Sequence, residues 1–147
     1  ALADSKEYGC HVIHVLEEGA LPPFSYSVGI QRSSNAPEVI QIGLTRALGH
    51  SIVNEYNRRV RTGDVFQAGK PYPGFIQGLA VTFERVDKSH YAEYLGWARW
   101  FYRGDAFDTL QVIYPATSGV WPWDADASEW FKARQPLLTV EASGTAG

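Results

Sequence analysis

The sequence predicts a single α+β domain: a mainly antiparallel sheet of five strands, or slightly more, with two main helices packed on it and a short C-terminal helix. Five segments alternate apolar and polar residues at period two, which is typical of half-buried strands, and two longer segments repeat apolar residues at the helical period. At 147 residues and 45% hydrophobic composition, the chain is large enough for one substantial core. This pattern favours an antiparallel sheet with one helix-covered face.

The first two strands are expected at 11–16 and 24–30, separated by the Gly- and Pro-containing segment EEGALPP. In the second strand, the large apolar side chains point one way, and Ser25 and Ser27 form a wetter face. Further strands are expected at 39–44, at about 77–86 and at 109–114, whereas 31–38 and 64–74 are expected to be loops.

The longest helix is expected from Thr45, whose hydroxyl can cap it, to about Thr62, with Gly63 placed to end it. Its apolar stripe consists of Leu48, Ile52, Val53, Tyr56 and Val60.

A second main helix is expected to begin at Asp87 or Ser89 and to run to residue 102, and a short helix is expected at 127–134, before Pro136. The whole chain, 1–147, is expected to be one domain with an ordered core of about 8–140 and a flexible tail at 141–147.

The second main helix is the most unusual segment, because YAEYLGWARWFY (91–102) has six aromatic rings in twelve residues. A helical projection at roughly 100° per residue places Trp97 at the edge of the apolar arc and Trp100 nearly opposite Tyr91. Either other elements cover this helix on two sides, or the indoles belong to a ligand or partner site, where Trp and Tyr are favoured. A second aromatic cluster, VWPWD, follows at 120–124. The predicted binding residues are Tyr26, Trp97, Trp100, Tyr102, Asp105, Trp121, Trp123 and Asp124.

Composition and charge narrow the function classes. The net charge of −3 argues against a nucleic-acid binder, which usually carries a basic face. The single cysteine, Cys10, cannot form an intramolecular disulfide, and the segment ALADSKEYG has no apolar leader. No run approaches eighteen apolar residues. We therefore expect a cytoplasmic protein that binds neither membrane nor nucleic acid.

The four histidines do not predict a metal site. His11 and His14 are three apart on a strand and should point to opposite faces, and neither HxH nor HExxH occurs. Ser25 and Ser27 lack the GxSxG context of an exposed nucleophile. The weak catalytic candidates that remain are His14, His50 and Asp105.

Five segments together resemble one known family: YGCHVIHV, PPFSYSVGI, EYLGWARWFYRGD, WPWD and FKARQPLL, in this order. The sequence resembles the bacterial domain of unknown function 4262 family over roughly residues 8–138. The resemblance implies no established activity, cofactor or catalytic residue. We treat the aromatic helix, WPWD and PPFSYSVGI as one expected neighbourhood, because all three belong to the same pattern.

Three functions remain open. The first is a non-enzymatic interaction protein, for example an immunity or accessory protein, that uses an aromatic and acidic face. The second is a small-ligand or flavin-type binding protein built around Tyr26, His14 and the wall at 97–102. The third is a hydrolase-like enzyme using Asp105, His14 or His50. No cofactor is predicted under the first function, and the sequence does not indicate the partner or the oligomeric state.

Overall fold

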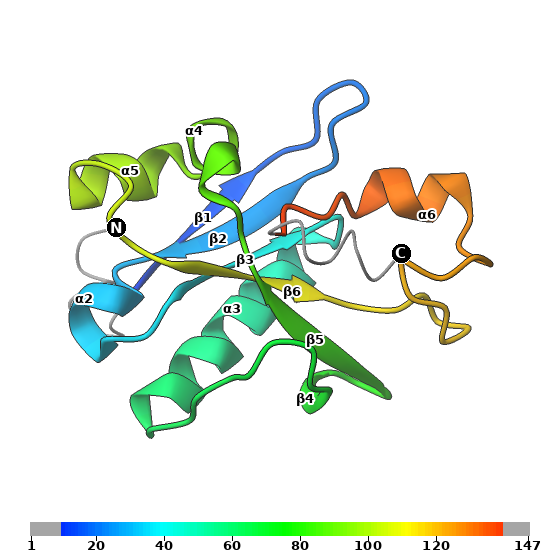
Figure 1. The fold of residues 1–147 in the computed structure, drawn as a ribbon, viewed down its shortest axis with the longest axis horizontal. Coiled ribbons are helices and arrows are strands. Elements are labelled where there is room, and N and C mark those ends of the chain that lie inside the picture. Colours follow the sequence, from blue (N-terminus) through cyan, green and yellow to red (C-terminus); the bar gives the residue numbers. More distant parts are fainter. Residues whose placement is uncertain (1–9, 140–147) are drawn as a thin grey trace.

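The computed structural model describes residues 10–139, which form a six-stranded mixed sheet flanked by helices (Figure 1). The strand order is β1-β2-β3-β6-β5-β4, and every neighbouring pair is antiparallel except β3 and β6. The strands are β1 (His11–Val15), β2 (Phe24–Val28), β3 (Glu38–Ile42), β4 (Tyr72–Ile76), β5 (Leu79–Arg85) and β6 (Thr109–Ile113). The predicted tail at 141–147 and the first residues of the predicted core lie outside the described residues.

The predicted α+β class is confirmed, and the sheet has six strands, one more than the five located in the sequence, with one parallel pair. The additional strand is β4, which extends from the end of the segment expected to be a loop. Pro73 and Gly74 hide it in the sequence, because both residues are unfavourable inside a sheet and are tolerated only at an edge. The one parallel pair is β3 and β6, because β6, the last strand in the sequence, lies between β3 and β5, and the β4–β5 hairpin forms the far edge.

The longest helix is confirmed almost to the residue as α3 (Arg46–Arg61). The Thr45 hydroxyl accepts a hydrogen bond from the Leu48 backbone N–H at 3.2 Å, and Gly63 follows the end with a φ of 102°. Leu48 is 41% exposed, so it does not belong to the buried stripe as expected. Gly49, the residue after Leu48, is buried against the sheet instead.

The second main helix is not continuous. It consists of a 3-10 turn (Lys88–His90), α4 (Tyr91–Tyr94) and α5 (Gly96–Tyr102). The break is at Leu95, whose φ of −116° and ψ of 40° are not helical and whose side chain is fully buried. Gly96 follows it, and glycine is a poor residue for the interior of a helix. The predicted short helix is present as α6 (Glu129–Arg134), capped by Ser128.

A short helix that was not predicted, α2 (Ile30–Ser34), follows β2 directly. Gly29 has a φ of 113°, a value that glycine adopts without strain, and it turns the chain out of the strand. The expected strand therefore ends at Val28 rather than at residue 30.

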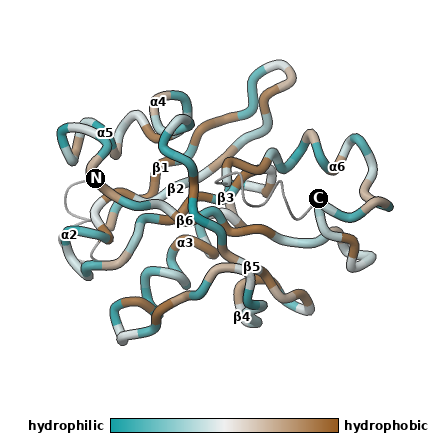
Figure 2. The backbone as a smooth tube through the Cα atoms, viewed as in Figure 1, coloured by the Kyte–Doolittle hydropathy of each residue, from teal (hydrophilic) through white to brown (hydrophobic). Residues whose placement is uncertain are grey.

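Helices cover both faces of the sheet, not one as expected. Successive strand side chains point to opposite faces, so Tyr26 and Val28 of β2 enter one core while Ser25 and Ser27 face the α3 side. On one face α3 packs with β3, β5 and β6, and on the other α4 and α5 pack over Tyr26 and Ile40. Figure 2 shows apolar residues concentrated along the strands at the centre of the molecule. Ser25 and Ser27 are 2% and 0% exposed, so the predicted wetter face of β2 is in fact buried.

Candidate functional site

The helix α5 presents two indoles to solvent. Trp97 is 59% and Trp100 is 70% exposed, and their ring centroids are 6.0 Å apart in an edge-to-face arrangement. The alternative in which other elements cover this helix on two sides is therefore wrong. We refer to Trp97 and Trp100 as the α5 indole surface.

Tyr26 lies beneath this surface and is not part of it. Its side chain is 1% exposed, and its hydroxyl oxygen accepts a hydrogen bond from the Trp97 backbone N–H at 3.0 Å. Burial raises the pKa of the Tyr26 hydroxyl, so it remains a neutral phenol. Tyr26 thus serves as a buried cap for the first turn of α5, and it positions Trp97 without contacting solvent.

Tyr102 anchors the other end of α5 to a buried carboxylate, Glu38. The Tyr102 hydroxyl donates a short hydrogen bond to Glu38 Oε2, and Ser27 Oγ donates to Oε1 at 2.6 Å. The backbone N–H groups of residues 29–31 donate to the same carboxylate at 3.1–3.2 Å. Burial raises the pKa of Glu38, and these donors oppose that shift. Glu38 thereby connects β2, the start of α2 and the end of α5.

The sequence did not identify Glu38, because it lay at the end of a polar segment expected to be a loop. The one available signal was its place as the first residue of an otherwise apolar strand, two positions before Ile40. A carboxylate at the start of a fully buried strand requires a set of donors.

Asp105 follows α5 and forms an ion pair with Arg99, with Oδ1 and Nε 2.7 Å apart. Its backbone oxygen also accepts a hydrogen bond from Lys88 Nζ. It lies with the α5 helix, whereas His14 and His50 lie on the α3 side of the sheet. The three weak catalytic candidates therefore do not form one site.

The WPWD segment forms a separate turn. The rings of Trp121 and Trp123 stack with centroids 5.1 Å apart, and Asp124 Oδ2 accepts a hydrogen bond from the Trp121 backbone N–H. Figure 1 places this loop, which follows β6, at the opposite end of the molecule from α5. The expectation of one aromatic neighbourhood is wrong for WPWD, although PPFSYSVGI and α5 do pack together.

On the α3 face, three side chains form a chain of hydrogen bonds. Ser25 Oγ lies 2.8 Å from His14 Nδ1, and His14 Nε2 lies 3.2 Å from His50 Nδ1. The two rings are nearly parallel, at 25°. Partial burial lowers the pKa of His14, and the positive charge of Arg46 and the neighbouring imidazoles lower it further.

Gly49 allows the two histidines to meet. A Cβ atom at this position would lie 2.3 Å from Gln41 Nε2 and 2.8 Å from Ser25 Oγ. The first turns of α3 therefore approach β2 and β3 more closely than any residue with a side chain would permit. His50, the next residue, is thereby brought to His14.

These histidines lie in an open groove between β1 and α3, with a volume of about 1430 Å³. We call it the β1–α3 groove. Among the described residues its lining contains three arginines and three histidines and no carboxylate. The lining residues are Cys10, His11, Val12, His14, Arg46, Ala47, His50, Asn54, Asn57, Arg58, Arg61 and Thr62.

The residues predicted for a flavin-type pocket do not come together, and the histidines do not form a metal centre. Tyr26 and His14 belong to opposite faces of the sheet, so the wall at 97–102 cannot form one pocket with both. Within residues 10–139, no three His, Cys, Asp or Glu side chains are placed to hold a metal ion. None of the helices in that range is long and apolar enough to span a bilayer.

Comparisons with known proteins support one assignment. Searches of curated proteins and of solved structures give no match. A family model described as a domain of unknown function (DUF4262) matches residues 4–128, a span that contains the α5 indole surface, the Glu38 cluster and the β1–α3 groove. Because the match covers most of the chain, the protein belongs to the domain of unknown function 4262 family.

Proposed function

We propose that this protein is a binding protein that docks a partner protein through the α5 indole surface. The observation that carries the proposal is the exposure of two adjacent indoles, Trp97 at 59% and Trp100 at 70%. Tryptophan is rarely left exposed in pairs, and it is among the residues most enriched in interface hot spots. An immunity or accessory role is one form of this function.

The contacts that hold α5 in place make the α5 indole surface rigid, which supports its use in recognition. The backbone of Trp97 is fixed by Tyr26, Tyr102 is fixed by Glu38, and Arg99 pairs with Asp105. These contacts involve the start, the end and the exposed side of a seven-residue helix. A surface that is already ordered loses less entropy when it binds, which raises affinity for a given contact area.

The charges beside the indoles favour an acidic rim on the partner. Arg99 lies between the two tryptophans in sequence, Arg103 follows the helix, and the Arg32 guanidinium lies 4.7 Å from the centre of the Phe101 ring. The ion pair with Asp105 neutralises Arg99 and Asp105 alike, which leaves the charges of Arg103 and Arg32 beside the indoles. The proposed surface is therefore aromatic and basic, in contrast to the aromatic and acidic face expected from the sequence.

Two tryptophans of equal exposure provide a controlled test. Trp100 on α5 and Trp130 on α6 are each 70% exposed. We expect Trp100→Ala to abolish affinity capture of a specific partner from extracts of the native cells, identified by mass spectrometry, and Trp130→Ala to retain it. The captured protein is then purified, and we expect its affinity for Trp100→Ala to fall by at least about tenfold, or 1.4 kcal/mol.

The same experiment can refute the proposal. If the wild type and both variants capture the same proteins with equal affinity, the α5 indole surface is not a docking site. Far-ultraviolet circular dichroism of the two variants verifies that each is folded, which is expected because both side chains lie mostly in solvent.

A further inference from the structure

We propose that the β1–α3 groove is a second binding site, separate from the α5 indole surface, and that it binds a small phosphate-bearing anion between Arg46 and His50, with His14 orienting the His50 ring. This site does not depend on partner docking, because it lies on the other face of the sheet. Its volume of about 1430 Å³ is sufficient for a metabolite-sized ligand, since ligand pockets usually measure roughly 300–1,000 Å³.

The first support is electrostatic. The chain as a whole carries a net charge of −3, yet the described lining of this groove carries arginines and histidines without a carboxylate. The arginines gathered in this concave surface raise the local concentration of anions above that expected from the net charge. An acidic protein with such a groove is suited to a small anion more than to a long polyanion, which would also meet the acidic remainder of the surface.

The second support is the orientation of the histidine pair. Ser25 is 2% exposed and has its hydroxyl 2.8 Å from His14 Nδ1, so it fixes the His14 ring from below. His14 Nε2 in turn lies 3.2 Å from His50 Nδ1. In the arrangement where Ser25 donates to His14 and His14 donates to His50, the Nε2–H of His50 points away from the pair as a donor. A ring held by such a buried partner is a preorganised donor.

Arg46 completes this end of the groove. It lies one helical turn before His50, and residues four apart on a helix are neighbours on the same face. Arg46 is close enough for its charge to lower the pKa of His14. A phosphate group has three terminal oxygens, so it can accept from the arginine fork and from the His50 imidazole together, and this distinguishes it from a carboxylate with two oxygens.

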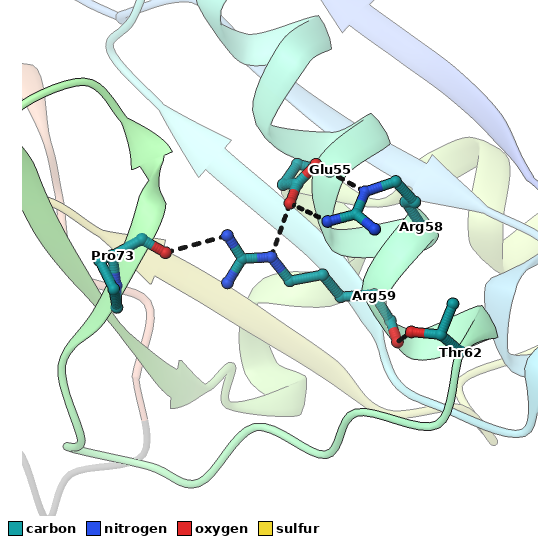
Figure 3. A network of polar contacts seen from close by, with 5 residues as sticks. All are labelled: Glu55, Arg58, Arg59, Thr62 and Pro73. Atoms are coloured by element: carbon teal, nitrogen blue, oxygen red, sulfur yellow. Dashed lines mark hydrogen bonds and ion pairs between the residues drawn. The ribbon is translucent and has the colours of Figure 1, made fainter.

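The opposite end of the groove is less suitable. Figure 3 shows that the Arg58 guanidinium faces Glu55, with Nη2 and Oε2 2.6 Å apart. This ion pair neutralises much of the charge that Arg58 would otherwise offer to a ligand. The phosphate group is therefore assigned to the Arg46 end, and the rest of a larger ligand would extend along α3 past Asn54.

The test is a titration of the intact protein with inorganic phosphate and with glycerol phosphate, followed by NMR of the histidine side chains at constant ionic strength. We expect saturable shifts of the His14 and His50 resonances with both probes, and no saturable shift when chloride is substituted. If inorganic phosphate alone binds, the site takes the free ion, and if glycerol phosphate binds more tightly, it takes a phosphate ester.

Matched arginine variants make the result specific. Arg46→Gln should weaken phosphate binding at least about tenfold. Arg85→Gln is the control, because Arg85 is exposed on β5 and its removal takes away the same charge. β5 lies four strands from β1, or about 19 Å at 4.8 Å per strand, so this variant should leave phosphate binding unchanged. Equal binding by the two variants, or shifts that chloride reproduces, would overturn the site. Neither outcome bears on docking at α5, which is measured with the tryptophan variants.

Discussion

His14 Nε2 and His50 Nδ1 lie 3.2 Å apart although the two residues are 36 positions apart in the sequence. One belongs to an edge strand and the other to the second turn of α3. Their contact depends on Gly49, which lets α3 approach the sheet, and on Ser25, which holds the His14 ring. Because the imidazoles share a hydrogen bond, a charge on His50 would lower the pKa of His14.

Removing the charge of Arg46 should raise the pKa of His14. Partial burial is the largest cause of the lowered pKa, and it is unaffected by Arg46→Gln, so the value should remain below that of a free imidazole. The other groups facing His14 are His11 on β1, Ser25 on β2 and His50 on α3. Titration of the His14 side-chain resonances by NMR measures the change. A pKa that is equal in the wild type and in Arg46→Gln would show that Arg46 does not act on this pair.

Gly49→Ala should destabilise the protein even though alanine is the better helix former. The gain in helix propensity is about 1 kcal/mol. The new Cβ would lie 2.3 Å from Gln41 Nε2, in a region where Gln41 is 1% exposed, and overpacking of this kind costs about 1–3 kcal/mol. Urea unfolding should therefore show a lower midpoint, and NMR should show a raised pKa of His14 as α3 moves outward and carries Arg46 and His50 away from it.

Ser51→Ala is the matched control for this substitution. Ser51 lies on the same helix but is exposed, so alanine there gains propensity without a clash. We expect an unchanged or slightly raised midpoint. A Gly49→Ala protein as stable as Ser51→Ala would mean that the helix does not pack as closely as the structure shows.

The sequence was sufficient for features that depend on local patterns. The cap at Thr45 and the glycine at position 63 defined α3, and period-two alternation located five of the six strands. The sequence was insufficient where residues far apart in the chain determine the local structure by contacting each other. Helix α2 forms because Glu38, across the turn, accepts its first N–H groups, and β4 is a strand because β5 pairs with it despite Pro73.

In the candidate site, too, the features that follow from local spacing were predictable and those that depend on tertiary contacts were not. The helical projection was enough to single out Trp97 and Trp100, because their directions on one helix follow from spacing alone. Tyr26 was predicted to be a binding residue, but it is 1% exposed beneath α5, and no local signal in the sequence shows that α5 covers it. The pairing of His14 with His50 depends on the tertiary approach at Gly49, so each histidine was a candidate but their contact was not predictable.

Glu38→Gln should be strongly destabilising. A carboxylate is an acceptor at both oxygens, and Glu38 receives hydrogen bonds from two hydroxyls and three backbone N–H groups. An amide in its place sets an NH₂ group against at least one N–H donor, whichever way it is oriented. Leaving a buried polar group unsatisfied costs about 1–3 kcal/mol, and here more than one is affected. The free energy of unfolding in urea measures the loss.

Tyr102→Phe is the milder comparison for Glu38→Gln. It removes one donor from Glu38 and the acceptor for the Arg32 backbone N–H, but the carboxylate and the α2 cap remain. We expect a smaller loss of about 1 kcal/mol. If Glu38→Gln were no more destabilising than Tyr102→Phe, the carboxylate would not be the central acceptor of this cluster.

Glu55 should contribute a component of stability that is lost in acid. Hydrogen bonds from Arg58 lower the pKa of Glu55 to about 2, with Arg59 adding to the effect (Figure 3). A carboxyl group whose pKa is lowered by folding stabilises the native state above its unfolded pKa of about 4.5, and that contribution disappears as pH falls towards 2. The Glu55 side chain is 25% exposed, so solvent screening limits the contribution to about 1 kcal/mol.

The wild type and Glu55→Gln should accordingly differ in urea midpoint at pH 7, and this difference should shrink as pH falls towards 2. Part of the difference at pH 7 reflects the position of Arg59, whose guanidinium also donates to the Pro73 carbonyl and lies 4.2 Å from the Phe75 ring centre, so that Glu55 helps to hold β4 against α3. Glu129→Gln is the control, because that carboxylate is 94% exposed and lies 3.6 Å from Lys132. A gap between the wild type and Glu55→Gln that persists unchanged at pH 2, where about half of the native Glu55 carboxyl groups are protonated, would show that the ion pair is not its source.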